Sequence, residues 1–120
     1  MTSVTNERPH LHIEASQFPE GTLLRCTGEI DMGSADCLMR ALTATIMAGS
    51  PEVLVDLREV SFLDSTAMRV LVEAHHILHD KGRSMQVLVT PQTAQLFHLL
   101  QLDDLFPTRV DRSLATQTVH

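Results

Sequence analysis

The sequence predicts a single α/β domain, built on a mixed β-sheet of four to five strands with crossover helices. The order of hydrophobic patterns along the chain is β-β-α-β-α-β-α, which is typical of strands joined through helices. The run Val53–Leu57 is short and almost wholly apolar, as expected for a central parallel strand covered by helices. At 120 residues the chain is long enough for one domain with a real core.

The first elements are predicted from alternation and turn residues. A loose, polar lead-in is expected over residues 1–9. Apolar and polar residues alternate over 10–14, which indicates a short strand. After a turn signal at 19–21, a second strand is expected over 22–30. Gly28 inside that strand suggests a bulge or a close backbone approach.

Two amphipathic helices are predicted on either side of the apolar strand. Ser34 ends a loop and is a candidate N-cap for the first helix. Apolar residues then recur at helical spacing as far as Gly49. A second helical pattern runs from Ala67 to Lys81, and Gly82 suits the position just after its end.

A further strand is predicted over 85–89, and a third helix follows it directly. Thr90 is an N-cap residue, and Pro91 behind it suits the first helical position because proline lacks the N–H that is unpaired there. Apolar residues over 94–100 supply the third helix.

The C-terminal part is predicted to be short elements at the edge of the domain. Leu105–Phe106 is expected to form a last edge strand. Asp111 is a candidate cap for a short terminal helix that carries Leu114. The domain should therefore span 10–115, with a tail at 116–120.

Composition narrows the function classes. A net charge of −6 argues against nucleic acid and against an anionic membrane surface as partners. No apolar run is long enough to span a bilayer, and the first residues lack the apolar core of a secretory signal, so a cytoplasmic location is expected. Cys26 and Cys37 form neither a disulfide framework nor a metal set, and both fall at positions predicted to face the core.

Asp64-Ser65-Thr66 is the most informative stretch of the chain. It follows the apolar strand and opens the second helical pattern, so it lies at a helix N-terminus, where free N–H groups and the helix dipole favour negative charge. Asp, Ser and Thr are all common N-caps, and capping alone explains them. A hydroxyl at this place can also accept a phosphate. The tripeptide by itself leaves both interpretations open.

Catalytic and cofactor signatures are missing from the sequence. The glycines form neither G-x-G-x-x-G nor a P-loop, so no nucleotide cofactor is expected. Ser65 is not in a G-x-S-x-G motif, and the nearest histidines in sequence (His75, His76, His79) lie too far along the same helix to act as its base. His75 and His79 have a spacing that can bind zinc, but no Glu lies between them in the H-E-x-x-H manner, so no metal site is expected. We therefore expect neither catalysis nor a small-molecule substrate.

Three segments resemble the STAS domain, the family of bacterial anti-sigma factor antagonists. Gly28–Asp31 is similar to the G-E-[IL]-D that ends the second strand of the family. Val53–Thr66 resembles the family's strand, turn and D-S-[ST] core, and this segment is the most specific of the three. Leu96–Phe106 resembles its last helix and L-x-x-L-F ending. The likeness covers roughly residues 10–115.

The resemblance implies a phosphorylation switch. In the family, the serine after the aspartate is phosphorylated by a partner that is both kinase and anti-sigma factor. That role falls on Ser65, with Thr66 as the fallback acceptor. Unphosphorylated, such a protein binds the kinase and frees a sigma factor; phosphorylated, it lets go. The partner-binding residues implied here are Asp31, Asp64, Ser65, Thr66, Met68 and Arg69.

Two departures and one alternative function accompany the resemblance. The family usually continues D-S-[ST]-G-[LI]-G, whereas this chain has Ala67 and Arg69 at the glycine positions. Alanine suits a helix better than glycine, but Arg69 adds a cation and bulk one turn from Ser65, where it can alter partner choice. STAS-like chains also serve as small accessory subunits that dock constitutively on an ABC transporter ATPase, and Asp64-Ser65-Thr66 would then be a cap within that interface.

Overall fold

The structure is a computed structural model that describes residues 10–111. It contains five strands and three helices in the order β-β-α-β-α-β-α-β. The strands are β1 (Leu11–Phe18), β2 (Gly21–Ile30), β3 (Glu52–Leu63), β4 (Ser84–Val89) and β5 (Thr108–Val110), and the helices are α1 (Ala35–Met47), α2 (Ser65–Asp80) and α3 (Pro91–Leu99).

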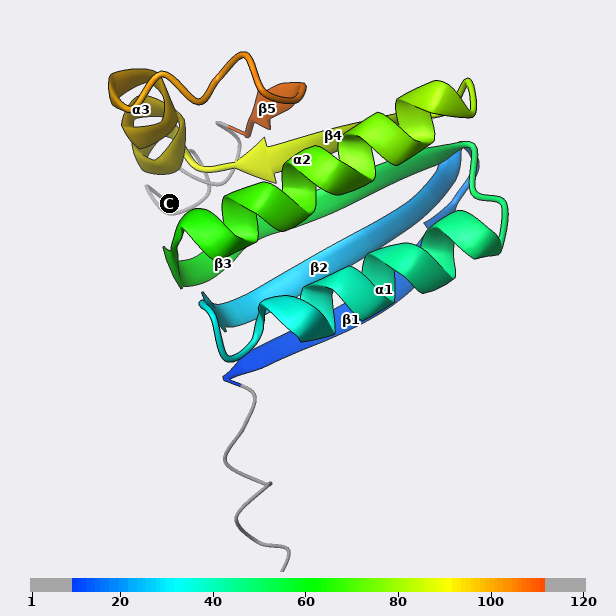
Figure 1. Cartoon of the computed structure of the whole chain (residues 1–120), viewed down its shortest axis with the longest axis horizontal. Helices are drawn as coiled ribbons and strands as arrows, with labels where there is room; N and C mark the ends of the chain where they lie inside the picture. The colour runs from blue at the N-terminus through cyan, green and yellow to red at the C-terminus, as the bar shows by residue number, and fades with distance from the viewer. Residues whose placement is uncertain (1–9, 112–120) are drawn as a thin grey trace, which may run out of the picture.

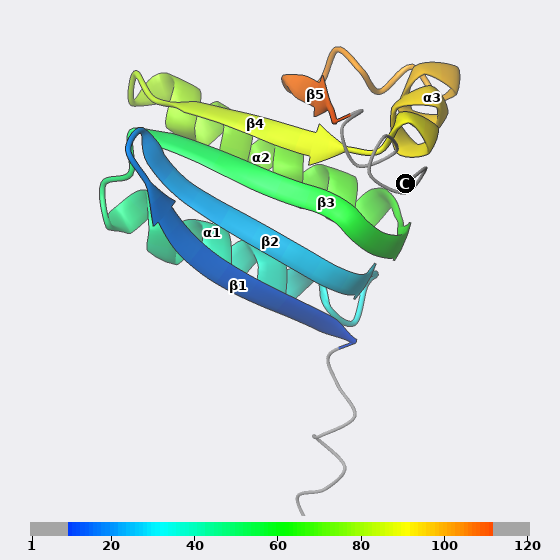
Figure 2. The ribbon, with the colours of Figure 1, turned by 180° about the vertical axis from the view of Figure 1, so that it is seen from behind.

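The strands form one sheet in their sequence order, β1-β2-β3-β4-β5. β1 is antiparallel to β2, and the remaining strands are parallel. Figure 1 shows α1 and α2 side by side on one face of the sheet, with α3 beyond the end of β4. Figure 2 shows the opposite face, over which no helix of the described residues lies. The mixed α/β fold with crossover helices is thus confirmed.

The core lies mainly between the sheet and the two helices, and it is mostly aliphatic because the chain has no Trp or Tyr and only four Phe. Alternate residues of the strands point into it. Leu24, Cys26 and Ile30 of β2 are buried, as predicted. Cys37 of α1 is only half-buried against this core. Burial raises the pKa of the Cys26 thiol to about 12, so this cysteine is a small buried hydrophobe.

Gly28 makes the close backbone approach that the sequence suggested. Its φ is +117°, and a Cβ at this position would lie 2.1 Å from the carbonyl oxygen of His10. The pairing of β2 with β3 shifts register at the same place. Only glycine fits both the backbone angle and the contact, because any Cβ would collide with a backbone atom that cannot move aside.

Element boundaries differ from the prediction mainly at strand ends. The last strand is Thr108–Val110, so the prediction of an edge strand at Leu105–Phe106 is wrong. Phe106 is instead buried and packs edge-on against Phe97 with ring centroids 6.1 Å apart, which holds that segment against α3 rather than in the sheet. β3 also continues past the apolar run as far as Leu63. The lead-in 1–9, the helix carrying Leu114 and the tail 116–120 lie outside the described residues.

No helix within residues 10–111 combines the length and the apolar character needed to cross a bilayer.

Candidate functional site

The site forms where β3 ends and α2 begins. Asp64 has an extended backbone and precedes the first helical residue, so it is the N-cap of α2. Its Oδ1 accepts hydrogen bonds from the N–H groups of Thr66 and Ala67, at 2.9 and 3.3 Å. The capping interpretation is therefore confirmed for the aspartate, which satisfies two of the free N–H groups at this helix end.

The Ser65 hydroxyl takes no part in the cap. It is the first residue of α2 and is exposed, and its hydroxyl makes no hydrogen bond with any described residue. Because Asp64 already caps the helix, the Ser65 hydroxyl is not needed for the fold. Thr66, the fallback acceptor, is half-buried in the same turn. Of the two hydroxyls, the structure leaves that of Ser65 more open to solvent.

The loop containing Asp31 lies beside this turn. The Asp64 N–H donates to the carbonyl of Ile30 at 3.2 Å, so the ends of β2 and β3 meet. Asp31 is half-buried, and its Oδ1 accepts from the N–H groups of Gly33 and Ser34 at 2.9 and 3.1 Å. The carboxylate of Asp31 therefore holds its own loop in shape, a role that the sequence did not predict.

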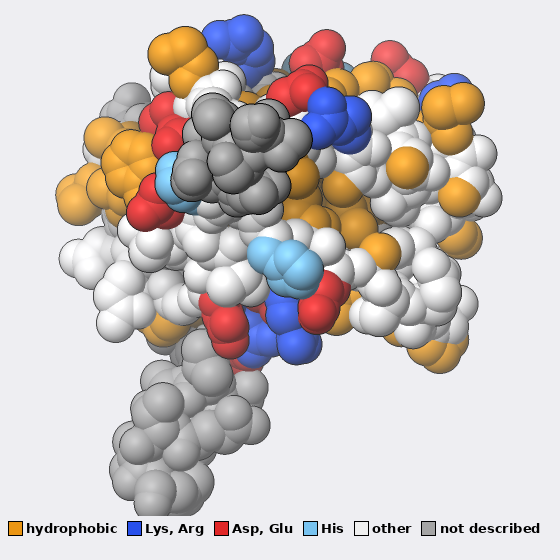
Figure 3. All heavy atoms as spheres, turned by 90° about the horizontal axis from the view of Figure 1, so that it is seen from below, with side chains coloured by type: hydrophobic (Ala, Val, Ile, Leu, Met, Phe, Trp, Pro, Cys, Tyr) orange, Lys and Arg blue, Asp and Glu red, His pale blue; other side chains and the backbone are white. Residues whose placement is uncertain are grey.

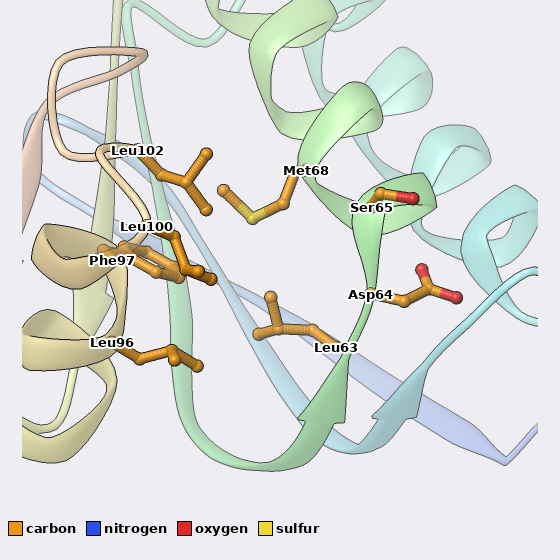
Figure 4. Close-up of a pocket in the computed structure, with 8 residues that line it drawn as sticks. All are labelled: Leu63, Asp64, Ser65, Met68, Leu96, Phe97, Leu100 and Leu102. Atoms are coloured by element: carbon orange, nitrogen blue, oxygen red, sulfur yellow. The ribbon is translucent and has the colours of Figure 1, made fainter.

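Two further predicted site residues lie on opposite sides of α2. Met68 is 8% exposed, and its side chain points toward α3 (Figure 4). Arg69 is exposed and forms no ion pair with any described residue. Ala67 is fully buried, which explains why a small residue is required at this position of the helix. The structure thus brings Asp31, Asp64 and Ser65 to one edge, while the Met68 side chain lies on the side of α2 that faces α3.

An apolar groove lies between the start of α2 and α3. In Figure 4, Met68 and Leu63 on one side face the leucines of α3 and its following loop across the groove. The Asp64 and Ser65 oxygens point to the opposite side of the α2 terminus (Figure 4). The residues that line the groove are Leu63, Asp64, Ser65, Met68, Leu96, Phe97, Leu100 and Leu102.

Leucines extend the groove onto the open surface. The apolar residues of 94–100 were expected to supply the third helix, but only Phe97 among those in α3 is buried. Leu96, Leu99 and Leu100 are 48%, 70% and 58% exposed. Exposed leucines clustered beside a groove mark an interaction surface. The cavity is about 250 Å³, below the ~300–1,000 Å³ of typical small-molecule sites, so it fits apolar side chains of a protein better than a cofactor.

A charged cluster lies on the sheet face opposite the helices, and it was not predicted from the sequence. Asp56 lies inside the apolar run but is 2% exposed on that face. Arg58 binds it with hydrogen bonds of 2.9 and 2.8 Å from Nε and Nη2, and also contacts Asp111. Burial opposes ionisation of Asp56, but the hydrogen bonds from Arg58 outweigh it and lower the pKa of Asp56. The sequence does hold a signal for this ion pair: Asp56 and Arg58 are two residues apart, so in a strand their side chains lie on the same face. This cluster ties β3 to the residue after β5.

The three histidines of α2 lie next to one another and bring their rings close together. The ring of His75 lies 5.7 Å from that of His76 and 6.0 Å from that of His79, between centroids. Burial and the two neighbouring imidazoles lower the pKa of His75. Within residues 10–111, no three His, Cys, Asp or Glu side chains are grouped so as to hold a metal ion.

The fold and this helix terminus are those of a known class of protein. The STAS domain model matches residues 12–116, and the chain belongs to the STAS domain family. It is similar to the anti-sigma-B factor antagonist of Staphylococcus aureus (strain NCTC 8325 / PS 47), with 27% identity over 97 residues that cover 80% of this chain and 90% of the relative.

Comparison with solved structures gives the same family of folds. The chain is similar to an anti-sigma factor antagonist from Mycobacterium paratuberculosis, with a TM-score of 0.76 and 27% identity over 91% of this chain and 93% of the other. It is also similar to the unphosphorylated form of the anti-sigma factor antagonist SpoIIAA, with a TM-score of 0.66 and 14% identity over 89% and 96% of the two chains. At that identity the second likeness supports the fold alone.

Proposed function

We propose that this protein is an anti-sigma factor antagonist, and that phosphorylation of Ser65 switches off its binding to an anti-sigma factor kinase. The observation that carries the proposal is an exposed, unbonded hydroxyl at the start of α2, on a residue that also lines the apolar groove. The names of the relatives support the class of partner. The protein acts by binding, releasing a sigma factor to direct transcription, and performs no chemistry itself.

The cap explains why the modification acts on binding and leaves the fold alone. Asp64 occupies the N–H groups of Thr66 and Ala67, so a phosphoryl group on Ser65 has no need of them and projects outward. A phosphate adds about −1.5 to −2 charges at neutral pH. A helix N-terminus tolerates that charge, but a partner that covers it must desolvate it next to the Asp64 carboxylate. The complex is destabilised while the free protein is not.

The groove supplies the attraction that the phosphate opposes. Leu96 and Leu100 are exposed in the free protein, and covering apolar surface of this kind stabilises a complex by roughly 25 cal/mol per Å². The kinase would place an apolar side chain between α2 and α3 and cover Ser65 with the adjoining backbone. Arg69 on the outer side of α2 and Asp31 in the neighbouring loop then lie at the margin of the contact, where charge sets partner choice.

The test is calorimetric titration of four proteins against the anti-sigma kinase: wild type, Ser65→Ala, Ser65→Asp and the phosphorylated protein. Wild type and Ser65→Ala should bind alike. Ser65→Asp should bind at least about tenfold more weakly, equivalent to about 1.4 kcal/mol, and the phosphoprotein more weakly still because it carries more charge. Leu100→Ala tests the groove and should also weaken binding, whereas Thr43→Ala on the exposed side of α1 is a control without effect.

Two results would contradict the proposal. Phosphoprotein that binds the kinase as tightly as wild type would exclude the switch. Equal binding of all four proteins to an ABC transporter ATPase would instead support a constitutive accessory subunit, in which the Ser65 turn is only a cap.

A further inference from the structure

Besides the groove next to Ser65, the molecule has a second candidate interaction surface, the outer edge of β1. β1 ends the sheet on one side, and no other strand within residues 10–111 pairs with its outer edge. An eight-residue edge strand exposes a row of N–H and C=O groups that can pair with another strand. Next to it, an apolar groove runs between β1 and α1, lined by Leu11, Ile13, Cys37, Ala41 and Ala44 among others.

The hydrogen bonds to β2 determine which residues of β1 present that edge. His10 receives the Glu29 N–H at 3.0 Å, and the two strands pair one-to-one from Leu11 opposite Gly28 onward. Bonded and non-bonded pairs alternate in an antiparallel ladder, so the even-numbered residues of β1 bond to β2. The N–H and C=O groups of Leu11, Ile13 and Ala15 therefore point outward, away from the sheet.

The side chains of the same strand are self-complementary. His12 and Glu14 lie on the sheet face without helices, within 3.4 Å of each other, while Leu11 and Ile13 face the core. If a second copy pairs antiparallel about a two-fold axis at Ile13, Ile13 meets Ile13 and Leu11 meets Ala15 in bonded pairs. His12 of each copy then lies opposite Glu14 of the other, in the closer non-bonded pair.

Registers centred on the neighbouring residues bring like side chains together. An axis at Glu14 would place the two Glu14 carboxylates face to face, and an axis at His12 would oppose the two imidazoles. Of these three axes, the one at Ile13 alone places each His12 opposite a Glu14 carboxylate while it pairs apolar side chains on the other face. Figure 3, viewed from the side of β1, shows apolar side chains next to a group of charged and histidine side chains.

We propose that the protein forms a two-fold symmetric dimer through β1, centred on Ile13, which joins the two sheets into one continuous sheet. The partner is a second copy because the complementarity is that of the strand with itself. β2 separates β1 from β3, so the dimer leaves the start of α2 and the groove beside α3 uncovered. The proposal is independent of the role of Ser65 and would stand if that role were wrong.

Sedimentation equilibrium with charge-exchanged variants tests the register. His12→Glu alone would place two carboxylates opposite each other at both symmetry-related pairs, because its partner across the axis is Glu14. Glu14→Lys alone would replace the carboxylate opposite His12 by an ammonium at both pairs, so the contact between His12 and Glu14 is lost. Each variant should raise the dimer dissociation constant at least about tenfold.

Mixing the two variants supplies the rescue. In a heterodimer, the new carboxylate of one chain meets the new ammonium of the other, and the second pair keeps the original His12 opposite Glu14. Dimerisation should therefore be restored to near the wild-type level. Glu20→Lys in the turn after β1 makes the same charge change as Glu14→Lys and should have no effect, since position 20 lies outside the paired segment.

A proline at the edge tests the backbone pairing separately. Ala15 is exposed and its N–H points outward, so Ala15→Pro should weaken the dimer and leave the pairing of β1 with β2 intact. Melting curves of every variant, and the rescued heterodimer itself, show that the chains fold. A wild-type protein that stays monomeric throughout the micromolar range would overturn the proposal, as would a dimer that ignores both charge variants or a mixture that shows no rescue.

Discussion

The beginnings of α1 and α2 use the same two residue types in opposite ways. At α1, Ser34 is 1% exposed, and its hydroxyl donates to the Glu29 carbonyl at 2.7 Å and receives the Asp31 N–H at 3.0 Å. At α2, Ser65 is exposed and its hydroxyl bonds to nothing in the described structure. Each serine has an aspartate near it, and each aspartate accepts two backbone N–H groups.

The two helix starts differ in the spacing between the aspartate and the serine. In the β2–α1 loop the serine is three residues after the aspartate, so its hydroxyl turns inward and completes the turn. At α2 the serine follows the aspartate directly, and the cap is finished without it. A hydroxyl that stabilises the fold is occupied by its hydrogen bonds, whereas a hydroxyl that does not is open to a kinase. Exchanging or modifying the two serines should therefore have opposite consequences.

The largest effect should be the choice of phosphate acceptor. Incubation with the cognate kinase and ATP should add one phosphate to wild type, almost all of it at Ser65, because Ser34 is buried and hydrogen-bonded. Ser65→Ala should abolish incorporation, and residual phosphate, if any, should move to Thr66. Quantitative phosphopeptide mapping measures this. A main modification outside residues 65–66 would contradict the assignment of the site.

The second effect concerns stability: removing the hydroxyl should destabilise the fold at Ser34 but not at Ser65. Ser34→Ala should lower the free energy of unfolding by about 1–3 kcal/mol, since it leaves buried backbone groups without their partner. Ser65→Ala should change it by less than about 0.5 kcal/mol, as for an ordinary surface position. Urea denaturation of both variants measures the difference. Equal losses would mean that the hydroxyl of Ser65 has a structural role after all.

The third effect distinguishes two exposed arginines, one on α1 and one on α2. Arg40 on α1 forms an ion pair with Asp36 at 2.6 Å, whereas Arg69 on α2 forms none with the described residues. Arg69→Gly and Arg40→Gly should each cost about 1 kcal/mol of stability, because glycine is a poor helix former. Only Arg69→Gly should alter the on-rate and the salt dependence of kinase binding. Stopped-flow measurements at several salt concentrations check this, and identical kinetics for wild type and both variants would reject a recognition role for Arg69.

The smallest effect is that of a negative charge on the free protein. Ser65→Asp should leave the melting temperature close to that of wild type, since a carboxylate at a helix N-terminus changes stability by only ~0.3–1 kcal/mol. Differential scanning calorimetry without the kinase measures it. An unfolded or strongly destabilised Ser65→Asp protein would show that the helix terminus is less tolerant of charge than the cap at Asp64 indicates, and the switch would lose its physical basis.

Much of the fold follows from local patterns. Within residues 10–111, alternation, helical spacing and the turn residues predict four of the five strands and the three helices, because these patterns report which side of an element faces the core. Thr90 caps α3 through the N–H of Thr93 at 3.2 Å, as its place before Pro91 predicts. The missed strand, Thr108–Val110, is three residues long and too short for alternation to reveal.

The candidate site was predicted less completely. Asp64, Ser65 and Thr66 follow from the strand-to-helix turn and from the family resemblance. The groove does not, because Leu96 and Leu100 have the same hydrophobic signature whether they are buried or exposed. The carboxylate of Asp31 was expected to be a partner contact, and its role in the loop emerges only from the backbone bonds that it accepts. Its contact with a partner stays a prediction.

The amino-acid sequence by itself indicated the fold class, a helix cap within Asp64-Ser65-Thr66, a bulge or close backbone approach at Gly28 and, through the family resemblance, the candidate acceptor Ser65. These are local properties: hydrophobic period, the side-chain oxygens next to a helix start, and backbone angles. Only the tertiary structure decided which hydroxyl is free, that α3 leaves leucines uncovered beside Met68, that Arg58 binds Asp56, and that the outward backbone of β1 falls on Ile13. Each of these depends on how whole elements pack and pair, because burial and hydrogen-bond pairing belong to contacts made by the complete fold.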